Sequence, residues 1–168
     1  MESKVKYGQE IGPNLIKLGR SLTKNQNLLM LLENQDLDPL NREKHPNEID
    51  GLKLLNDLIR FVPLLTADEK DDQNVKAKIV IVCDKGQPQV NIDNENLDIL
   101  IYVYCPFEQW LIAGDQLRPF AIMSEIRQSI QDKRINGLGE IKYEGFNLSL
   151  LTEEMSAYAM RFTINAFS

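Results

Sequence analysis

Apolar residues near the start of the chain recur at helical spacing in two stretches. The first begins after Pro13 and continues to Leu22, and the second runs from about Asn25 to Asn34. Proline is tolerated in the first turn of a helix, where its missing N–H would be unpaired in any case. The residues between the two stretches leave two interpretations open, one interrupted helix or a short helical hairpin.

Two further apolar stretches predict neighbouring strands at the centre of the fold. Leu97–Cys105 is rich in β-branched and aromatic residues with a charge only at Asp98, so we expect a strand buried on both faces. Pro106 should end it, because proline cannot donate to a sheet ladder. Ala77–Cys83 precedes it, and the turn predicted at Asp84–Gly86, with a short polar connection, makes the two strands antiparallel.

The strongest helical pattern lies in the second half of the chain, from Arg118 to Lys133. Ile122, Ile126 and Ile130 recur at a spacing of four and form an apolar stripe. This stripe should pack on one face of the sheet. Trp110, just upstream, is interpreted as a packing anchor rather than a ligand platform.

The last predicted element is a two-stranded hairpin. Glu140–Leu150 and Ala157–Phe167 both alternate apolar and polar residues, with a turn at Thr152–Glu154 between them. A slip of phase at Gly145 predicts a β-bulge. The whole pattern predicts an α+β fold: an antiparallel or mixed sheet, N-terminal helices and one amphipathic helix packed on the sheet. We expect a single domain over residues 1–168, with a flexible arm of about residues 1–9.

The remaining segments read as connections. Gln35–Ile49 is dense in Asp, Asn and Pro, and Thr66–Asn74 is an acidic stretch expected to form an exposed loop. Leu54–Leu65 combines a helical turn with a short strand, and Gly137–Gly139 is read as a turn into the hairpin rather than a phosphate-binding loop.

Composition limits the classes of function. The chain carries 19 Lys and Arg against 25 Asp and Glu, a net charge of −6, which argues against a specific nucleic-acid-binding surface, although acidic proteins can use local basic patches. No apolar run reaches the roughly 18 residues that a membrane-spanning helix needs. Cys83 and Cys105 should be buried, reduced thiols that could pair only if they lay side by side. We therefore expect a soluble cytosolic protein.

No catalytic, cofactor-binding or metal-binding constellation is visible. His45 is the one histidine, CxxC and HExxH motifs are absent, and Asp36 to Glu43 lacks the glycine and terminal glutamate of a calcium loop. A small enzyme would have to use Asp84, Cys105 and His45, which nothing in the sequence connects. We therefore predict no enzyme activity and no cofactor.

Several segments, taken together, carry a resemblance to a known family. They are NLLMLLENQDLDPLN, NLDILIYVYCPFEQWLI, RPFAIMSEIRQSI, GLGEIKYEGFNLSLL and EEMSAYAMRFTINAF. Their succession resembles the tail-terminator, or tail-completion, proteins of tailed bacteriophages. This resemblance covers residues from Asn27 to Phe167.

The resemblance implies a non-enzymatic virion structural protein. It would cap the tail tube and join the tail to the head or neck as a hexameric ring, with the tail tube protein and head-completion or neck proteins as partners. It would lie in the virion tail or neck, and in the host cytoplasm during assembly. The alternatives are another neck protein, such as a head-completion or connector protein, or a binding or adaptor domain. The acidic residues Asp68, Glu69, Asp71 and Asp72 would suit the lumen of a tube that passes DNA.

Overall fold

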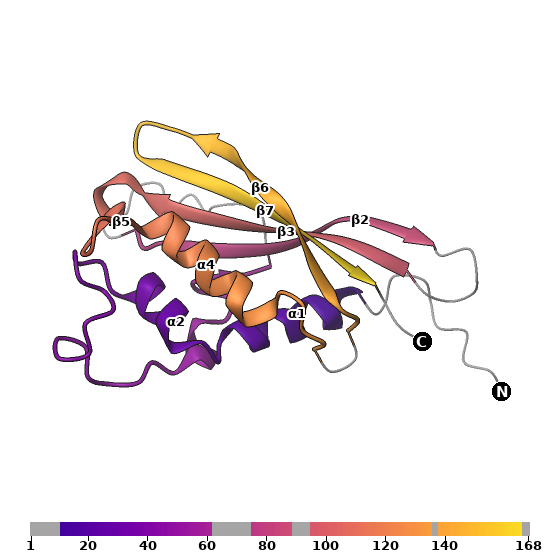
Figure 1. The fold of residues 1–168 in the computed structure, drawn as a ribbon, viewed down its shortest axis with the longest axis horizontal. Coiled ribbons are helices and arrows are strands. Elements are labelled where there is room, and N and C mark those ends of the chain that lie inside the picture. Colours follow the sequence, from indigo (N-terminus) through magenta and orange to yellow (C-terminus); the bar gives the residue numbers. More distant parts are fainter. Residues whose placement is uncertain (1–10, 62–74, 89–94, 136–137, 166–168) are drawn as a thin grey trace.

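One mixed sheet forms the centre of the molecule. The computed structural model describes residues 11–61, 75–88, 95–135 and 138–165. Its five-stranded sheet has the order β1-β2-β3-β7-β6 (Figure 1). The strands are β1 (Ile59–Arg60), β2 (Lys78–Pro88), β3 (Glu95–Pro106), β6 (Ile141–Leu151) and β7 (Met155–Asn165). Only β1 and β2 are parallel, and every other neighbouring pair is antiparallel. The predicted α+β class and the antiparallel pairing of the two central strands are confirmed.

Three α-helices cover one face of this sheet (Figure 1). They are α1 (Ile11–Leu22), α2 (Gln26–Glu33) and α4 (Arg118–Ile130). The three isoleucines of the predicted stripe in α4 are all completely buried, so the packing of this helix on the sheet is confirmed. The helix ends three residues before the predicted Lys133, because Gln131 already has extended backbone angles.

The two N-terminal helices are separate, which decides between the two sequence interpretations. Asn25 caps α2, since its side-chain oxygen accepts a hydrogen bond of 3.1 Å from the backbone N–H of Leu28. The break before α2 also allows close packing, because the α-carbon of Gly51 lies against Thr23 with no space for a side chain. The first helix begins at Ile11, two residues before Pro13.

The central strand β3 is buried along its length on one face, but on the other face it is buried only near Tyr104, so the prediction that both faces are buried is wrong for the middle of the strand. Leu97, Ile99 and Ile101 face the helices and are at most 2% exposed. Leu100 and Tyr102 project from the other face and are only half-buried. The sequence misleads here because this second face is also apolar, which hides the alternation of a one-sided strand. We call it the open face.

The predicted turn at Asp84–Gly86 is also wrong. These residues lie inside β2, where the register shifts between Cys83 and Lys85, and the strand continues to Pro88. An extra residue in one strand of an antiparallel pair forms a bulge, which has the same Gly and Asp preferences as a turn. By contrast, the bulge predicted at Gly145 is confirmed by a register shift between Tyr143 and Gly145 and by a φ of 121°.

Shorter elements complete the described part of the chain. Leu54–Leu65 is predicted to combine a helical turn with a short strand, and its described part, residues 54–61, contains a turn and β1. The 3-10 helix η1 (Gly51–Leu54) comes just before, and residues 62–65 lie outside the described residues. A second 3-10 helix, η2 (Phe107–Gln109), leads into a small ribbon of β4 (Leu111–Ile112) and β5 (Gln116–Leu117), which the sequence analysis missed. Residues 35–49 are irregular, as expected. The N-terminal arm, the acidic segment 66–74 and Gly137 lie outside the described residues.

A buried arginine joins the helices to the ribbon. Arg118, at the start of α4, is completely buried and donates four hydrogen bonds to backbone carbonyl oxygens. Its guanidinium contacts the oxygens of Gln109 and Leu31 at 2.7 Å, and those of Asn34 and Asp36 at 2.6 Å. Burial lowers the pKa of this side chain, while Cys105 and then Asp36 oppose that effect. Arg118 therefore holds the C-terminal end of α2 against the segment that precedes α4.

Candidate assembly surface

The last strand of the sheet, β6, has a free edge in the described part of the chain. It pairs along its length with β7 on one side, and it is the terminal strand of the order β1-β2-β3-β7-β6. The opposite edge in the described residues is β1, whose Ile59 and Arg60 pair with Ile79 and Val80 of β2. Free edges offer unpaired N–H and C=O groups to another strand, and natural proteins usually blunt them.

The two halves of β6 differ in how well this edge is protected. Its first half carries Lys142, Glu144 and the bulge at Gly145, which are devices that hinder edge pairing. Its second half, residues 146–151, reads FNLSLL and contains no charge and no proline. A second register shift, between Leu148 and Leu150, lies within this half.

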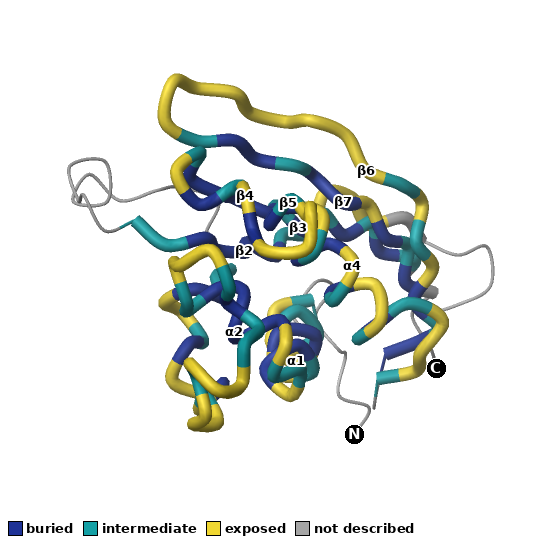
Figure 2. Tube along the Cα trace, turned by 60° about the vertical axis from the view of Figure 1, so that its left-hand side comes forward, coloured by how far each residue is buried: buried dark blue, intermediate teal, exposed yellow. Residues whose placement is uncertain are grey.

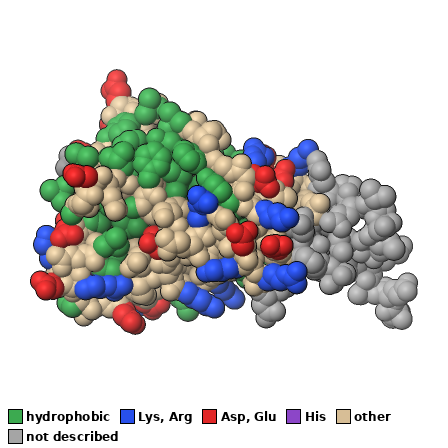
Figure 3. Space-filling view, in the orientation of Figure 1, with side chains coloured by type: hydrophobic (Ala, Val, Ile, Leu, Met, Phe, Trp, Pro, Cys, Tyr) green, Lys and Arg blue, Asp and Glu red, His purple; other side chains and the backbone are tan. Residues whose placement is uncertain are grey.

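Large apolar side chains stand exposed on this second half. Phe146 is 51% exposed, Leu148 49%, Leu150 38% and Leu151 65%. The strand is exposed over nearly its whole length (Figure 2), and hydrophobic side chains gather over the β6–β7 hairpin (Figure 3). We call these four residues the hairpin surface. The hairpin surface spans both faces of β6, because Phe146 and Leu148 pair with residues on the helix side and Leu150 lines the open face.

Aromatic contacts support the helix-side part of the hairpin surface. The ring of Phe120, on α4, lies 6.1 Å from that of Phe146 and 5.2 Å from that of Tyr158, measured between centroids. Trp110 extends the cluster, with its ring 6.3 Å from Tyr158 and its Nε1 donating to the Cys105 carbonyl at 3.3 Å. Trp110 is thus a packing residue, as interpreted from the sequence, and the surface rests on packed rings.

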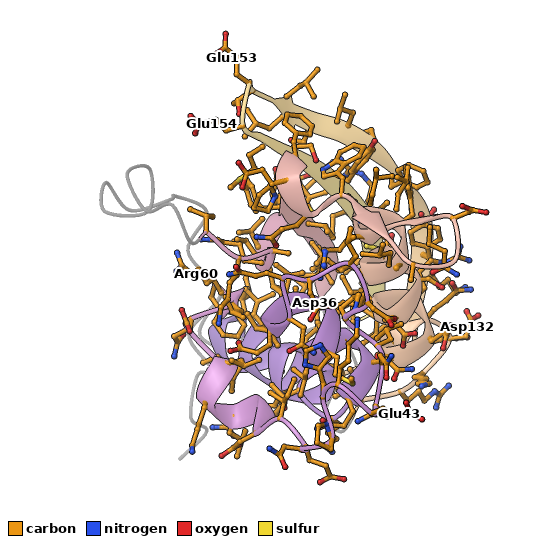
Figure 4. All side chains as sticks on the ribbon, turned by 90° about the vertical axis from the view of Figure 1, so that its left-hand side faces the viewer. Asp36, Glu43, Arg60, Asp132, Glu153 and Glu154 are labelled. Carbon is orange, nitrogen blue, oxygen red and sulfur yellow. The ribbon has the colours of Figure 1, made fainter. Side chains whose placement is uncertain are left out.

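The turn of the hairpin is fixed by its own hydrogen bonds. The Thr152 hydroxyl accepts from the backbone N–H of Met155 at 3.0 Å, and the Thr152 N–H donates to the Met155 carbonyl at 2.9 Å. The Glu154 carbonyl accepts from the N–H of Phe107 at 3.0 Å, which ties the turn to η2. Glu153 and Glu154 form an acidic tip at the end of the hairpin, far from Asp36 in the view along the molecule (Figure 4).

The open face of the sheet contains a shallow hollow of about 500 Å³. Leu100, Tyr102 and Leu150 contribute to its lining, so it borders the hairpin surface. Burial, and then the neighbouring Tyr102, raise the pKa of Tyr104 further above neutrality than that of an ordinary tyrosine. The hollow therefore offers mostly apolar and neutral polar contacts, together with one carboxylate, that of Asp84.

The three residues considered for a small enzyme are not brought together. Asp84 lies at the bulge inside β2 and pairs with Arg161 at 3.2 Å. Cys105 is completely buried beneath the helices, near the other end of the sheet. His45 lies on the 35–49 connection with its Nε2 2.7 Å from a carboxylate oxygen of Asp36. The arrangement contains no nucleophile beside a base.

The two cysteines are both free, and the register places them well apart. Cys83 pairs across the sheet with Ile99, which is six residues from Cys105 along β3. At ~3.3 Å per residue this separates the thiols by roughly 20 Å, too far for a disulfide. Cys105 is buried as predicted, but Cys83 is only half-buried, because the helices do not extend over the distal part of β2.

The described residues contain no group of three or more His, Cys, Asp or Glu side chains that could hold a metal ion. Asp36, Asp38 and Asn41 instead bond within their own connection: Asp36 accepts from the N–H of Asp38 at 2.8 Å, and Asn41 donates to Asp38 at 2.8 Å. No described helix is long and apolar enough to cross a membrane. The acidic residues 68, 69, 71 and 72 lie outside the described part of the chain.

The alternation in the sequence located the apolar positions of β6 but did not decide whether they are buried or exposed. The alternation alone does not reveal how far α4 covers the hairpin: Phe120 of α4 packs against Phe146, yet the large apolar side chains of the second half of β6 stay exposed. The uncharged run FNLSLL was the available signal for an exposed edge.

Comparison with known proteins yields one family. The sequence model of the YomW family matches residues 25–164, which is most of the chain. No curated protein matches significantly.

Proposed function

Because the chain belongs to the YomW family, a family of Bacillus phage-like proteins, we propose that it is a structural protein of a phage virion. In this proposal the protein caps the tail tube and joins the tail to the head or neck as a ring, with six subunits as the expected number. It performs no catalysis, and its partners are the tail tube protein and the head-completion or neck proteins. It assembles in the host cytoplasm and ends in the virion.

The uncharged second half of β6, with its four exposed large apolar side chains, is the observation that supports assembly. A ring requires heterologous contacts, in which one surface of a subunit meets a different surface of the next. In the described residues the sheet has two unlike edges, the apolar β6 edge and the β1 edge, where Ile59 and Arg60 pair with β2. Pairing of these edges between successive subunits would bury the hairpin surface and satisfy the backbone groups of residues 146–151.

The size of the hairpin surface suits reversible assembly. With ~200 Å² for a fully exposed large side chain, the four exposures add to roughly 400 Å². That is about half of the ~800 Å² that each partner buries in a standard interface, and edge backbone and neighbouring groups would have to supply the rest. At ~25 cal/mol per Å² it contributes about 10 kcal/mol, against an association cost of roughly 4–15 kcal/mol. Ring formation should therefore depend on concentration.

The test is the mass of the purified protein by light scattering over a range of concentrations, followed by electron microscopy. We expect a ring that dissociates on dilution. The double variant Leu148→Lys/Leu151→Lys should abolish it, because two desolvated charges would oppose the contact. The control Leu37→Lys/Leu52→Lys changes two leucines that are 67% and 65% exposed elsewhere, and it should assemble normally.

A protein that stays monomeric at every concentration would refute spontaneous ring formation. Incubation with purified tail tubes would then distinguish a stopper that assembles only on a tube from a free adaptor domain that accepts a partner strand on β6. Equal loss of assembly in the control variant would show that added charge, rather than the hairpin surface, is responsible.

A further inference from the structure

A second surface, on the side of the molecule away from the open face, is strongly basic. A hollow of about 480 Å³ lies between α1 and the residues that follow α4. Its lining includes Lys17, Arg20, Lys24, Lys133 and Arg134, together with two serines and one isoleucine, and no acidic side chain. Lys and Arg side chains gather over these elements in Figure 3. We call it the basic trough.

The cations of the basic trough form two walls. Lys17 and Arg20 lie on successive turns of α1, and Lys24 follows just after its end, so this wall extends for roughly 10 Å at 1.5 Å per residue. Lys133 and Arg134 form the other wall, more than 100 residues later in the chain. A row of cations with a second row beside it matches a run of phosphates better than a single phosphate ion.

Ordinary structural roles do not account for the cluster. Cations near helix C-termini are stabilised by the helix dipole, and Lys133 does donate to the Gln128 carbonyl at 2.5 Å. Among the described residues, however, no carboxylate forms an ion pair with Lys17, Arg20, Lys24 or Lys133. The nearby Glu125 does not line the trough and accepts instead from the Asn25 amide at 2.9 Å.

From this arrangement we infer that the basic trough binds the phosphate backbone of DNA without reading its sequence. All five cations are exposed, which suits contacts made through the release of counterions. Among the described residues that line the trough, Ile135 is the single hydrophobic residue, and the other apolar lining comes from the stems of polar side chains, so the trough has no large apolar side chain with which to enter a lipid surface. The inference concerns a different surface from the hairpin and does not depend on ring formation.

Binding is measured by fluorescence anisotropy of a labelled 20-base-pair duplex with the full chain, at a protein concentration where light scattering shows a single species. With about four phosphates neutralised, log K should fall with log salt with a slope of about −3.6, or roughly 150-fold between 50 and 200 mM salt. Duplexes of unrelated sequence should bind equally.

The variant Lys17→Gln/Arg20→Gln/Lys24→Gln should weaken binding at least about 10-fold and reduce the slope by close to 3. Lys133→Gln, on the opposite wall, should reduce the salt slope by about 1. The control Arg42→Gln/Lys44→Gln/Lys53→Gln makes the same change of net charge at exposed residues outside the trough, and it should bind within about twofold of the unchanged protein. Matching thermal melts verify that each variant is folded.

Four results would overturn the inference. One is the absence of duplex binding by the unchanged protein at low salt, and another is an equal loss in the trough and control variants. The third is capture by phosphatidylglycerol vesicles with no binding to the duplex, which would assign the trough to a membrane surface. The last is competition by inorganic phosphate as strong as that of unlabelled duplex, after correction for ionic strength. This result would show that the trough binds a single phosphate ion rather than a phosphate backbone.

Discussion

Replacing Arg118 with methionine should be among the most damaging single substitutions in this protein. The change keeps most of the side-chain volume but removes all four hydrogen bonds to the carbonyls of Leu31, Asn34, Asp36 and Gln109. A hydrogen bond that involves a charged group contributes about 1.5–3 kcal/mol, so four represent roughly 6–12 kcal/mol. The variant no longer has to bury a charged guanidinium, which offsets part of this loss of stability.

The net loss of unfolding free energy should be about 3–5 kcal/mol, the range seen when a buried charge interaction is broken. For a chain of this length, a loss of 4 kcal/mol lowers the melting temperature by roughly 8–16 °C. Circular dichroism, with urea and thermal unfolding of the purified protein, measures both. Arg118→Lys should cost less than Arg118→Met, because an ammonium keeps the charge but cannot span four carbonyls.

Arg127→Met provides the matched control on the same helix. Arg127 is exposed, donates to Gln131 at 2.8 Å and lies over the ring of Tyr143 at 4.2 Å, contacts that should be worth no more than about 1–2 kcal/mol. If the two methionine variants unfold at the same urea concentration, the four carbonyl contacts do not stabilise the fold as argued. Hydrogen exchange should also show the greatest loss of protection at the end of α2.

Two further predictions concern thiols and glycines. Burial raises the pKa of the Cys105 thiol to about 12. A thiol reagent at pH 8 should therefore modify Cys83 rapidly and Cys105 only when the protein unfolds. Mass spectrometry follows the modification over time, and rapid labelling of both cysteines in the folded protein would contradict this prediction. Gly51→Ala should lower the free energy of unfolding by at least about 2 kcal/mol, because the new β-carbon would collide with the backbone of Thr23. At Gly12 a β-carbon would meet open space, so Gly12→Ala should be neutral or slightly stabilising. Urea unfolding of both variants measures the difference.

The elements that sequence predicted well depend on local patterns. The stripe of α4 and the hairpin with its bulge at Gly145 are each encoded within about 25 consecutive residues, and both are found. The open face of β3 was misjudged because Leu100 and Tyr102 are as apolar as the residues opposite them. The periodicity of a sequence shows which residues are apolar. It does not show whether helices or other elements cover both faces of the sheet that contains them.

The candidate surfaces were harder to foresee because they combine distant segments. Arg118 contacts carbonyls 82–87 residues earlier in the chain, and carbonyl oxygens leave no signature in a sequence. The basic trough joins residues 17–24 to residues 133–135, so each part alone reads as a few scattered surface cations. Net charge is a property of the whole chain and conceals such a local excess.

The strand order also bears on how the chain folds. The hairpins β2–β3 and β6–β7 each form from neighbouring segments, but the sheet is complete only when β3 pairs with β7, and the chain between them contains η2, the β4–β5 ribbon, α4 and β6. Closing so long a loop is entropically costly and slows folding. Because α4 packs on β3, an early unit of β2, β3 and α4 would shorten the search that β7 must complete. Before β7 pairs with β3, the apolar edge of β3 is exposed to other chains. Newly made chains should therefore be most prone to aggregate before the β6–β7 hairpin docks.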